Sequence, residues 1–371
     1  MNFRINKKEL LDALNKAVRA ISTTTPLPSL SGIKLEAEAD SITLISSDSN
    51  ISIKTVLDNK DKEIFNVYEP GEIVIDSRYV LEIVRKIDSD SITFETIDGT
   101  LIRIYGGNSE FKINCMKAHE SPEINFAING TPFKFETEKF FDIIDETAFA
   151  CSDKDTRPIL TGVNFKAKEG KLYVNATDSY RLASKIVDID ENLDFNITIP
   201  SVYLNDVYHS ISLEKEIEIA IDSQKISFIF DRSLIQTRLL DDIFPDVSKL
   251  IPTNLLQKVS VRSRDLVNAI DRTSFIKSDG KNIVKLSINE KEIAITSSNQ
   301  IGSSYENIDV LSFEGTPFEI SCSGKYLVDA IKAIGSDEVV LSFSGELKPF
   351  IVTNKDDDSI IQLISPVRTY K

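Results

Sequence analysis

The sequence has few of the residues that would support several common kinds of function. Its 371 residues include no tryptophan, two histidines and three cysteines, Cys115, Cys151 and Cys322. An odd and scattered set of cysteines argues against a disulfide framework and fits a reducing compartment. No Cys or His pair has the spacing of metal ligands, so we expect no structural metal site and no other cofactor.

Long apolar runs are also absent. No segment approaches the roughly 18 residues of a membrane span, and the N-terminus, MNFRINKKELLDAL, lacks the apolar core of a signal peptide. Hydrophobic residues make up 41% and charged residues 27%, the balance of a soluble globular chain. We therefore expect a cytoplasmic protein of two or three domains with no membrane partner.

The overall charge is acidic. With 43 Lys and Arg against 58 Asp and Glu, the formal net charge is −15. Such a balance normally counts against nucleic-acid binding, because neutralising phosphates requires basic side chains. The distribution of the basic residues along the chain therefore matters more than the total.

One pattern occurs three times along the chain. Each copy has an alternating strand, a small polar turn and a second strand, and the three turns are built on Asp48, Asp178 and Asn299. Several markers recur in the same order with a period of about 124 residues, which indicates a triplicated unit. We place three similar domains at residues 1–124, 125–252 and 253–371.

Each repeat contains two helical patterns among its strands. Ser77, Ser201 and Ser323 each follow a strand and precede an apolar helix, so we expect them to be N-caps. Turn residues between alternating runs predict hairpins at Asp98-Gly99, Glu169-Gly170 and Asn289-Glu290. The predicted helices span 7–21, 77–86, 138–152, 201–211, 263–277 and 323–335. The predicted fold class is α+β, with two helices packed on antiparallel sheets in each domain.

The sequence lacks the common enzyme motifs. It has no P-loop, no dinucleotide-binding glycine pattern and no GxSxG elbow. The two histidines, His119 and His209, are expected to be ordinary exposed residues. A metal-dependent nuclease or polymerase stays open as an alternative, and its acidic pairs would be Asp153/Asp155, Asp188/Asp190 and Asp241/Asp242. Triplication favours a protein that is not an enzyme, because one active site rarely needs three copies of a domain.

The predicted helices carry slightly more basic than acidic residues, so the negative charge lies in the sheets and loops. Six helices, each ~10 Å wide, would close a ring with a bore of ~9 Å, whereas twelve helices from two chains give ~28 Å. Only the wider ring admits duplex DNA, which basic helices would contact through phosphates without reading bases. The middle repeat weakens this hypothesis, because Lys139 is the only basic residue in 138–152.

Three motifs are more specific than these patterns: ATDSYRLA at 176–183, Phe244-Pro245-Asp246 running to Leu250-Ile251-Pro252, and Pro366-Val367-Arg368. With them the whole chain resembles the β subunit of bacterial DNA polymerase III, the replicative sliding clamp family. The resemblance implies the DNA clamp fold, assembled as a head-to-tail homodimeric ring around duplex DNA. It also implies a processivity subunit that tethers the replicative polymerase during DNA replication and has no catalytic activity.

The resemblance further implies a client-peptide cleft between the middle and last domains. The polymerase catalytic subunit, the clamp loader and other clients would bind there through short peptide motifs. Carried over residue by residue, the cleft is lined by Arg157, Leu160, Thr177, Ser179, Tyr180, Arg181, Leu182, Pro245, Leu250, Ser323, Tyr326, Pro349, Ser365, Pro366, Val367 and Arg368. An apolar groove rimmed by Arg and Tyr suits extended peptides with Leu and Phe anchors.

The sequence departs from the family in places. Ser365 stands where the family often has Met, Ser323 where it often has Asn, and residues 369–371 extend past the usual end. Peptide preference is therefore left open. For DNA contacts, Thr24 stands where a member can have Arg, and the remaining candidates are Arg78, Lys86 and Arg157.

The resemblance places the dimer contact at Phe111 and Ile113 on an edge strand and at Phe275 and Ile276 in the last domain. The alternative is that these four side chains belong to the core of their own chain. A repeat-built scaffold that binds proteins without encircling DNA also stays open as a function.

Overall fold

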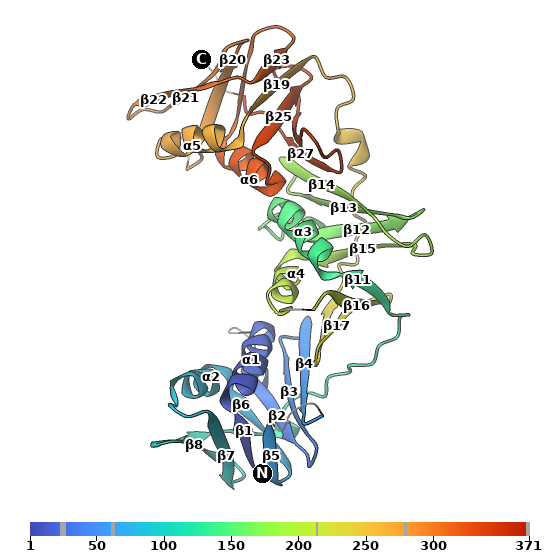
Figure 1. Cartoon of the computed structure of the whole chain (residues 1–371), viewed down its shortest axis with the longest axis vertical. Helices are drawn as coiled ribbons and strands as arrows, with labels where there is room; N and C mark the ends of the chain where they lie inside the picture. The colour runs from blue at the N-terminus through green and yellow to red at the C-terminus, as the bar shows by residue number, and fades with distance from the viewer. Residues whose placement is uncertain (23–26, 61–63, 213, 278–279, 369–371) are drawn as a thin grey trace. The chain divides into compact units, whose positions relative to one another are not determined.

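The computed structural model describes residues 1–22, 27–60, 64–212, 214–277 and 280–368 (Figure 1). Thr24 and residues 369–371 lie outside these ranges. The chain forms two compact units: unit 1 is Met1–Phe140 with Val202–Leu239, and unit 2 is Phe141–Ser201 with Leu240–Lys371. No helix within the described ranges is long and apolar enough to cross a membrane.

Unit 1 contains two antiparallel sheets. The five-stranded sheet has the order β5 (Phe65–Glu69), β1 (Asn2–Asn6), β7 (Ser91–Asp98), β8 (Leu101–Gly106) and β9 (Ser109–Asn114). The nine-stranded sheet has the order β10 (Met116–Lys117), β6 (Gly71–Asp76), β2 (Gly32–Ala37), β3 (Ser41–Ser47), β4 (Ile51–Asp58), β18 (Ser233–Arg238), β17 (Lys225–Phe230), β16 (Glu216–Ile221) and β11 (Phe133–Glu136).

Unit 2 repeats this arrangement with one large and one small antiparallel sheet. The nine-stranded sheet has the order β15 (Phe195–Pro200), β12 (Gly162–Lys168), β13 (Lys171–Thr177), β14 (Arg181–Asp188), β27 (Ile360–Ile364), β26 (Phe350–Asn354), β25 (Glu338–Phe343), β19 (Gln257–Arg262) and β23 (Ser312–Glu314). The four-stranded sheet has the order β22 (Ser303–Asp309), β21 (Glu292–Ser298), β20 (Ile283–Ile288) and β24 (Phe318–Ser323).

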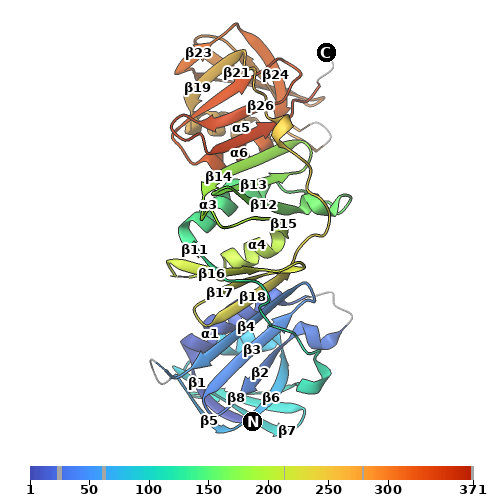
Figure 2. The same cartoon turned by 90° about the vertical axis from the view of Figure 1, so that its right-hand side faces the viewer.

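Both large sheets join strands from neighbouring sequence repeats. In unit 1, β4 pairs with β18, which places Ile51 opposite Thr237. In unit 2, β14 pairs with β27, which places Arg181 opposite Ile364. Figure 2 shows the continuous sheet that contains β4 and β18. The middle repeat therefore contributes strands to both units, and the domain boundaries drawn from the sequence stay predictions.

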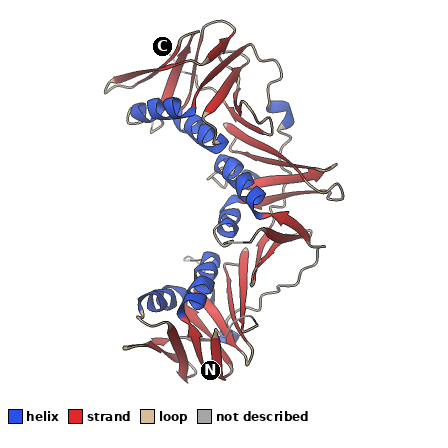
Figure 3. Cartoon of the chain, in the orientation of Figure 1, coloured by secondary structure: helices blue, strands red, loops and turns tan. Residues whose placement is uncertain are grey.

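Six α-helices occur in the described residues, at the six predicted places (Figure 3). They are α1 (Lys7–Ala17), α2 (Ser77–Lys86), α3 (Thr137–Thr147), α4 (Ser201–Tyr208), α5 (Ser263–Thr273) and α6 (Gly324–Ile334). Helix α1 packs against α2, and α5 packs against α6. These elements confirm the predicted α+β class of helices on antiparallel sheets.

The helix ends confirm one predicted N-cap and correct another. The side chain of Ser323 accepts a hydrogen bond from the Tyr326 amide and caps α6. At α2 the cap is Asp76, whose carboxylate accepts from the Arg78 amide, and the Ser77 hydroxyl instead donates to the Ser31 carbonyl. The prediction of a Ser77 cap was therefore wrong. A carboxylate at the N-cap also interacts favourably with the positive end of the helix dipole.

The predicted hairpins are confirmed. Asp98-Gly99 joins β7 to β8, Glu169-Gly170 joins β12 to β13, and Asn289-Glu290 joins β20 to β21. Both residues of the second turn have positive φ, 51° and 74°. Two residues in that region match the twist of antiparallel strands, which explains why the short turn closes.

Each unit has an apolar core between helices and sheets. In unit 1, Leu10, Leu14 and Ala17 are fully buried, and they lie on one helical face because of their spacing. In unit 2, the Phe343 ring lies 5.0 Å from that of Phe350, and both side chains are fully buried. These cores hold the loops that carry the sites described next.

Candidate peptide-binding cleft

The turn between β13 and β14 has a backbone fixed by side chains. The Asp178 Oδ1 atom accepts hydrogen bonds from the amides of Tyr180 at 2.8 Å and Arg181 at 3.0 Å. The Thr177 hydroxyl donates to the Arg181 carbonyl at 2.6 Å and accepts from the Ser179 amide at 3.1 Å. Ser179 has a φ of 76°, a left-handed conformation that such side-chain bonds stabilise. The turn therefore holds the backbone of Tyr180 in place, and the side chain of Tyr180 is 63% exposed.

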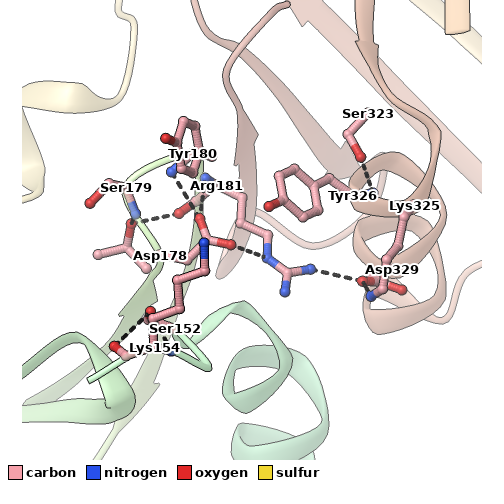
Figure 4. A network of polar contacts seen from close by, with 11 residues as sticks. Ser152, Lys154, Asp178, Ser179, Tyr180, Arg181, Ser323, Lys325, Tyr326 and Asp329 are labelled. Atoms are coloured by element: carbon pink, nitrogen blue, oxygen red, sulfur yellow. Dashed lines mark hydrogen bonds and ion pairs between the residues drawn. The ribbon is translucent and has the colours of Figure 1, made fainter. Parts of the chain in front are cut away.

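Arg181 links this turn to helix α6 (Figure 4). Its Nε atom lies 3.0 Å from Asp178 Oδ2, and its Nη1 atom lies 2.8 Å from Asp329 Oδ2. The Arg181 side chain is only 11% exposed, and its guanidinium carbon lies 4.5 Å from the centre of the Tyr326 ring. Burial, followed by the Asp178 carboxylate, raises the pKa of the Tyr326 hydroxyl. The network thus joins residues of the middle and last repeats within unit 2.

A cavity of about 680 Å³ opens beside this network. Its walls come from the β13–β14 turn, the end of α5, the start of α6 and the C-terminal segment. Backbone bonds from Ser365 to the Tyr180 carbonyl (2.9 Å) and from Val367 to the Ser321 carbonyl (2.7 Å) fix that segment. The cavity has a size typical of ligand pockets.

The cavity gathers six of the predicted cleft residues. They are Tyr180, Ser323, Tyr326, Ser365, Pro366 and Val367. Three others lie buried: Leu160, Thr177 and Leu182. Leu182 packs with Val247 and Leu363 in a small apolar cluster. The exposed members are Arg157, Ser179, Pro245, Leu250 and Arg368, while Pro349 is half-buried and the Arg181 side chain is mostly buried. The roles of all these residues in peptide binding stay predictions.

Sequence reasoning missed part of this cavity. Ile270, Asn282 and Val328 also line it. The Asn282 side chain donates to the carbonyls of Thr273 and Ile276, which closes the end of α5. The apolar periodicity of α5 and α6 marks their buried faces, but the sequence has no signal that places Asn282 beside Tyr326.

The residues predicted for the dimer contact differ in burial. Phe275 is 75% exposed and Phe111, on β9, is 36% exposed. Ile113 packs partly against the core of unit 1, and Ile276 is 6% exposed within its own chain. Strands β9 and β22 are edge strands of their sheets, and Tyr305 on β22 is 63% exposed.

Two of the three DNA-facing candidates are exposed cations beside carboxylates. Arg78 pairs with Asp76 at 2.8 Å and Lys86 pairs with Glu82 at 3.1 Å, with both basic side chains more than 70% exposed. The hydrogen bond from Arg78 lowers the pKa of Asp76. Arg157 is exposed. Surface pairs of this kind are weak, so a phosphate can compete for the cation.

The acidic pairs singled out for metal chemistry occupy turns and strand ends. Asp188 pairs with Lys171 at 3.0 Å, Asp190 accepts from the Asn192 amide, and Asp242 accepts from the Ile243 amide. Within the described residues, no three His, Cys, Asp or Glu side chains gather closely enough to hold a metal ion.

Comparisons with known proteins match the whole chain. Family models of the DNA polymerase III beta subunit match in three parts: the N-terminal domain at residues 1–125, the central domain at 134–246 and the C-terminal domain at 248–368. The beta sliding clamp of Bacillus subtilis is 36% identical over 378 residues, with all of both chains covered.

Solved structures agree with these matches. The DNA polymerase sliding clamp of Bacillus subtilis superposes with a TM-score of 0.94 at 35% identity, and both chains are fully covered. The DNA polymerase III beta chain of Streptococcus pneumoniae gives 0.95 at 31% identity, covering 99% of this chain and 100% of its own.

Proposed function

Because the chain belongs to the DNA polymerase III beta subunit family of sliding clamps, we propose that two copies close a ring around duplex DNA. The ring would tether the replicative polymerase and so make DNA synthesis processive. The observation that carries this proposal is the match along the entire chain to a beta sliding clamp. That match supports a clamp over a protein scaffold that never encloses DNA.

Exposed sheet edges support the dimeric ring. Strand β9 of one copy would pair with β22 of the other, because each ends its sheet and unpaired edges are prone to join another chain. Phe111 and Phe275 would then lose their exposed apolar surface at the contact. Ile113 and Ile276 are already packed in their own chain, and they would lie beneath Phe111 and Phe275 at the contact.

The cavity beside Tyr180 supports client binding. An extended peptide with apolar anchors would lie against Tyr180, Tyr326 and Pro366, over the apolar cluster that contains Leu182. The polymerase catalytic subunit and the clamp loader would share this cleft. Ser365 adds a hydroxyl where the resemblance expects a thioether, which reduces the apolar surface offered to an anchor.

The closed ring would stay on DNA because it surrounds the duplex, not because it binds the duplex tightly. Arg78, Lys86 and Arg157 would contact phosphates only transiently, in keeping with the chain's net charge of −15. The protein would catalyse no reaction itself and would act in the cytoplasm.

The test is primer extension on singly primed circular DNA with a cognate polymerase and clamp loader. The proposal expects product length to increase severalfold when the chain is added. A Tyr326→Ala variant should lose most of that increase, whereas Lys258→Glu, at an exposed position on β19, should keep it. Unchanged product length with the natural chain would contradict the function.

A further inference from the structure

Unit 1 contains a structural copy of the cleft turn. The Asp48 Oδ1 atom accepts from the amides of Asn50 and Ile51, both at 2.8 Å. The Ser47 hydroxyl donates to the Ile51 carbonyl at 2.9 Å and accepts from the Ser49 amide at 3.0 Å. Ser49 has a φ of 82°. Each of these contacts corresponds to one made by residues 177–181 in unit 2.

The surrounding strands and turns follow the same correspondence. The Arg238 amide donates to the Asn50 carbonyl at 3.0 Å, as Ser365 does to Tyr180. The Leu30 amide donates to the Leu27 carbonyl at 3.0 Å, as Leu160 does to Arg157. Pro122-Glu123-Ile124 follows the order of Pro245-Asp246-Val247. Unit 1 therefore contains a second cleft of the same backbone design.

A pocket of about 300 Å³ marks this second cleft. Its floor differs chemically from the first one. The cross-strand pair Leu182 and Leu363 of unit 2 corresponds to Ser52 and Gln236 in unit 1. Gln236 is 4% exposed, and its side chain is hydrogen-bonded to Ala127, Ser227 and Lys225. Ser52 and Gln236 offer an apolar anchor less apolar contact surface than the Leu182 and Leu363 pair of unit 2 does.

Two cations lie together at the wall of this pocket. Lys225 on β17 is directly opposite Arg238 on β18. Like charges in that position are normally destabilising. Lys225 donates to the Asn125 carbonyl and to Gln236, and its charge also interacts with the Asp222 carboxylate, which accepts from the Lys225 amide. Within the described ranges, no carboxylate lies within ion-pair distance of Arg238. The only carboxylate among the pocket residues is that of Glu123, which is exposed. This arrangement favours an anion bound beside Arg238, with Lys225 adding to the positive charge of the wall.

We propose that this pocket is a second peptide site, which binds an extended segment through an Asp or Glu side chain placed against Arg238 and Lys225. Ser49, Asn50 and Asn125 line the same pocket and offer polar groups to the peptide backbone. The extended shape follows from the correspondence with the cleft of unit 2, and the acidic side chain follows from the charge of the wall. Because this site lies wholly within unit 1, peptide binding to it can be tested independently of client binding at the first cleft.

The experiment is a selection of displayed random nonapeptides on the full-length protein. An excess of a short peptide with Leu and Phe anchors blocks the first cleft during selection. Enriched sequences should contain a fixed Asp or Glu. A fluorescent synthetic copy of one such peptide is then titrated, and Arg238→Glu should weaken its binding at least tenfold. Glu123→Gln should strengthen binding about threefold, since it removes the opposing carboxylate.

Matched controls separate this site from the first cleft. Lys258→Glu makes the same change of charge at a distant exposed cation and should leave affinity unchanged. Tyr326→Ala should also leave it unchanged, while weakening the peptide with apolar anchors. The proposal is overturned if no acidic sequence is enriched, if Arg238→Glu binds as well as the natural chain, or if Tyr326→Ala abolishes binding of the acidic peptide.

Discussion

The ion pair between Arg181 and Asp329 should stabilise unit 2 far more than the neighbouring pair between Lys325 and Asp329. Arg181 is 11% exposed and reaches Asp329 at 2.8 Å, whereas Lys325 is 69% exposed and pairs with the same carboxylate at 2.5 Å. A hydrogen bond to a poorly solvated charged group contributes about 1.5–3 kcal/mol. An exposed ion pair contributes about 0–1 kcal/mol.

These magnitudes predict a larger loss of stability for one of two single substitutions than for the other. Asp329→Asn leaves the Arg181 guanidinium with Asp178 as its one carboxylate partner among the described residues, so the melting temperature of unit 2 should fall by roughly 3–12 °C. Lys325→Gln keeps the Arg181 pair intact and should lower the melting temperature by less than about 4 °C. Differential scanning calorimetry of the full-length chain measures the melting temperature of each variant.

Hydrogen exchange locates the effect. In Asp329→Asn, amides of the turn at residues 178–182 should exchange faster, because Arg181 no longer ties the turn to α6. Helix α1 in unit 1 should keep its protection. Equal melting temperatures for the two variants, or a larger loss with Lys325→Gln, would refute the assignment of stability to the buried pair.

Three further outcomes follow from burial and exposure. Burial raises the pKa of Asp206 to about 6, so stability from this carboxyl is present below pH ~4 and is lost as the pH rises through about 6. Asp206→Asn should therefore gain on the order of 1 kcal/mol over the natural chain at pH 8 and nothing at pH 4, as read from urea midpoints. If two copies pair as proposed, Phe275→Asp should yield monomers at micromolar concentration by light scattering, whereas Ile243→Asp, at a site 86% exposed in the loop after β18, should leave the dimer intact; dimeric Phe275→Asp would count against the edge contact. Burial raises the pKa of the Cys322 thiol, which is 0% exposed, to about 12, so Cys322 should resist a thiol reagent at pH 8 until the chain is unfolded, and its fast labelling in native protein would contradict that burial.

Local patterns in the sequence predicted local structure well. The helices begin where the apolar residues stop alternating and instead recur every three to four positions. The turns form at Asp48, Asp178 and Asn299 because their side chains accept hydrogen bonds from the amides that follow. The Ser77 cap was wrong because Asp76, one residue earlier, caps the helix by accepting from the Arg78 amide, and the Ser77 hydroxyl donates to the Ser31 carbonyl instead. Where two adjacent residues are both suitable N-caps, tertiary contacts decide which of them caps the helix.

Contacts between distant residues could not be predicted in this way. Strand β4 pairs with β18 about 180 positions later, and periodicity fixes which face of a strand is buried but not its neighbour. The bond from Arg181 to Asp329 and the burial of Ile276 are likewise set by packing. The family resemblance placed Tyr180, Tyr326 and Pro366 together, which composition and spacing alone did not.

The most direct test of the ring is retention on DNA before and after the DNA is cut. Labelled protein is loaded by a clamp loader onto a nicked circle, the loader is removed, and the circle is then opened at one restriction site. The ring account predicts long residence on the closed circle and rapid loss after linearisation, at a rate that falls when the ends are blocked. Equal residence on circular and linear DNA would contradict it.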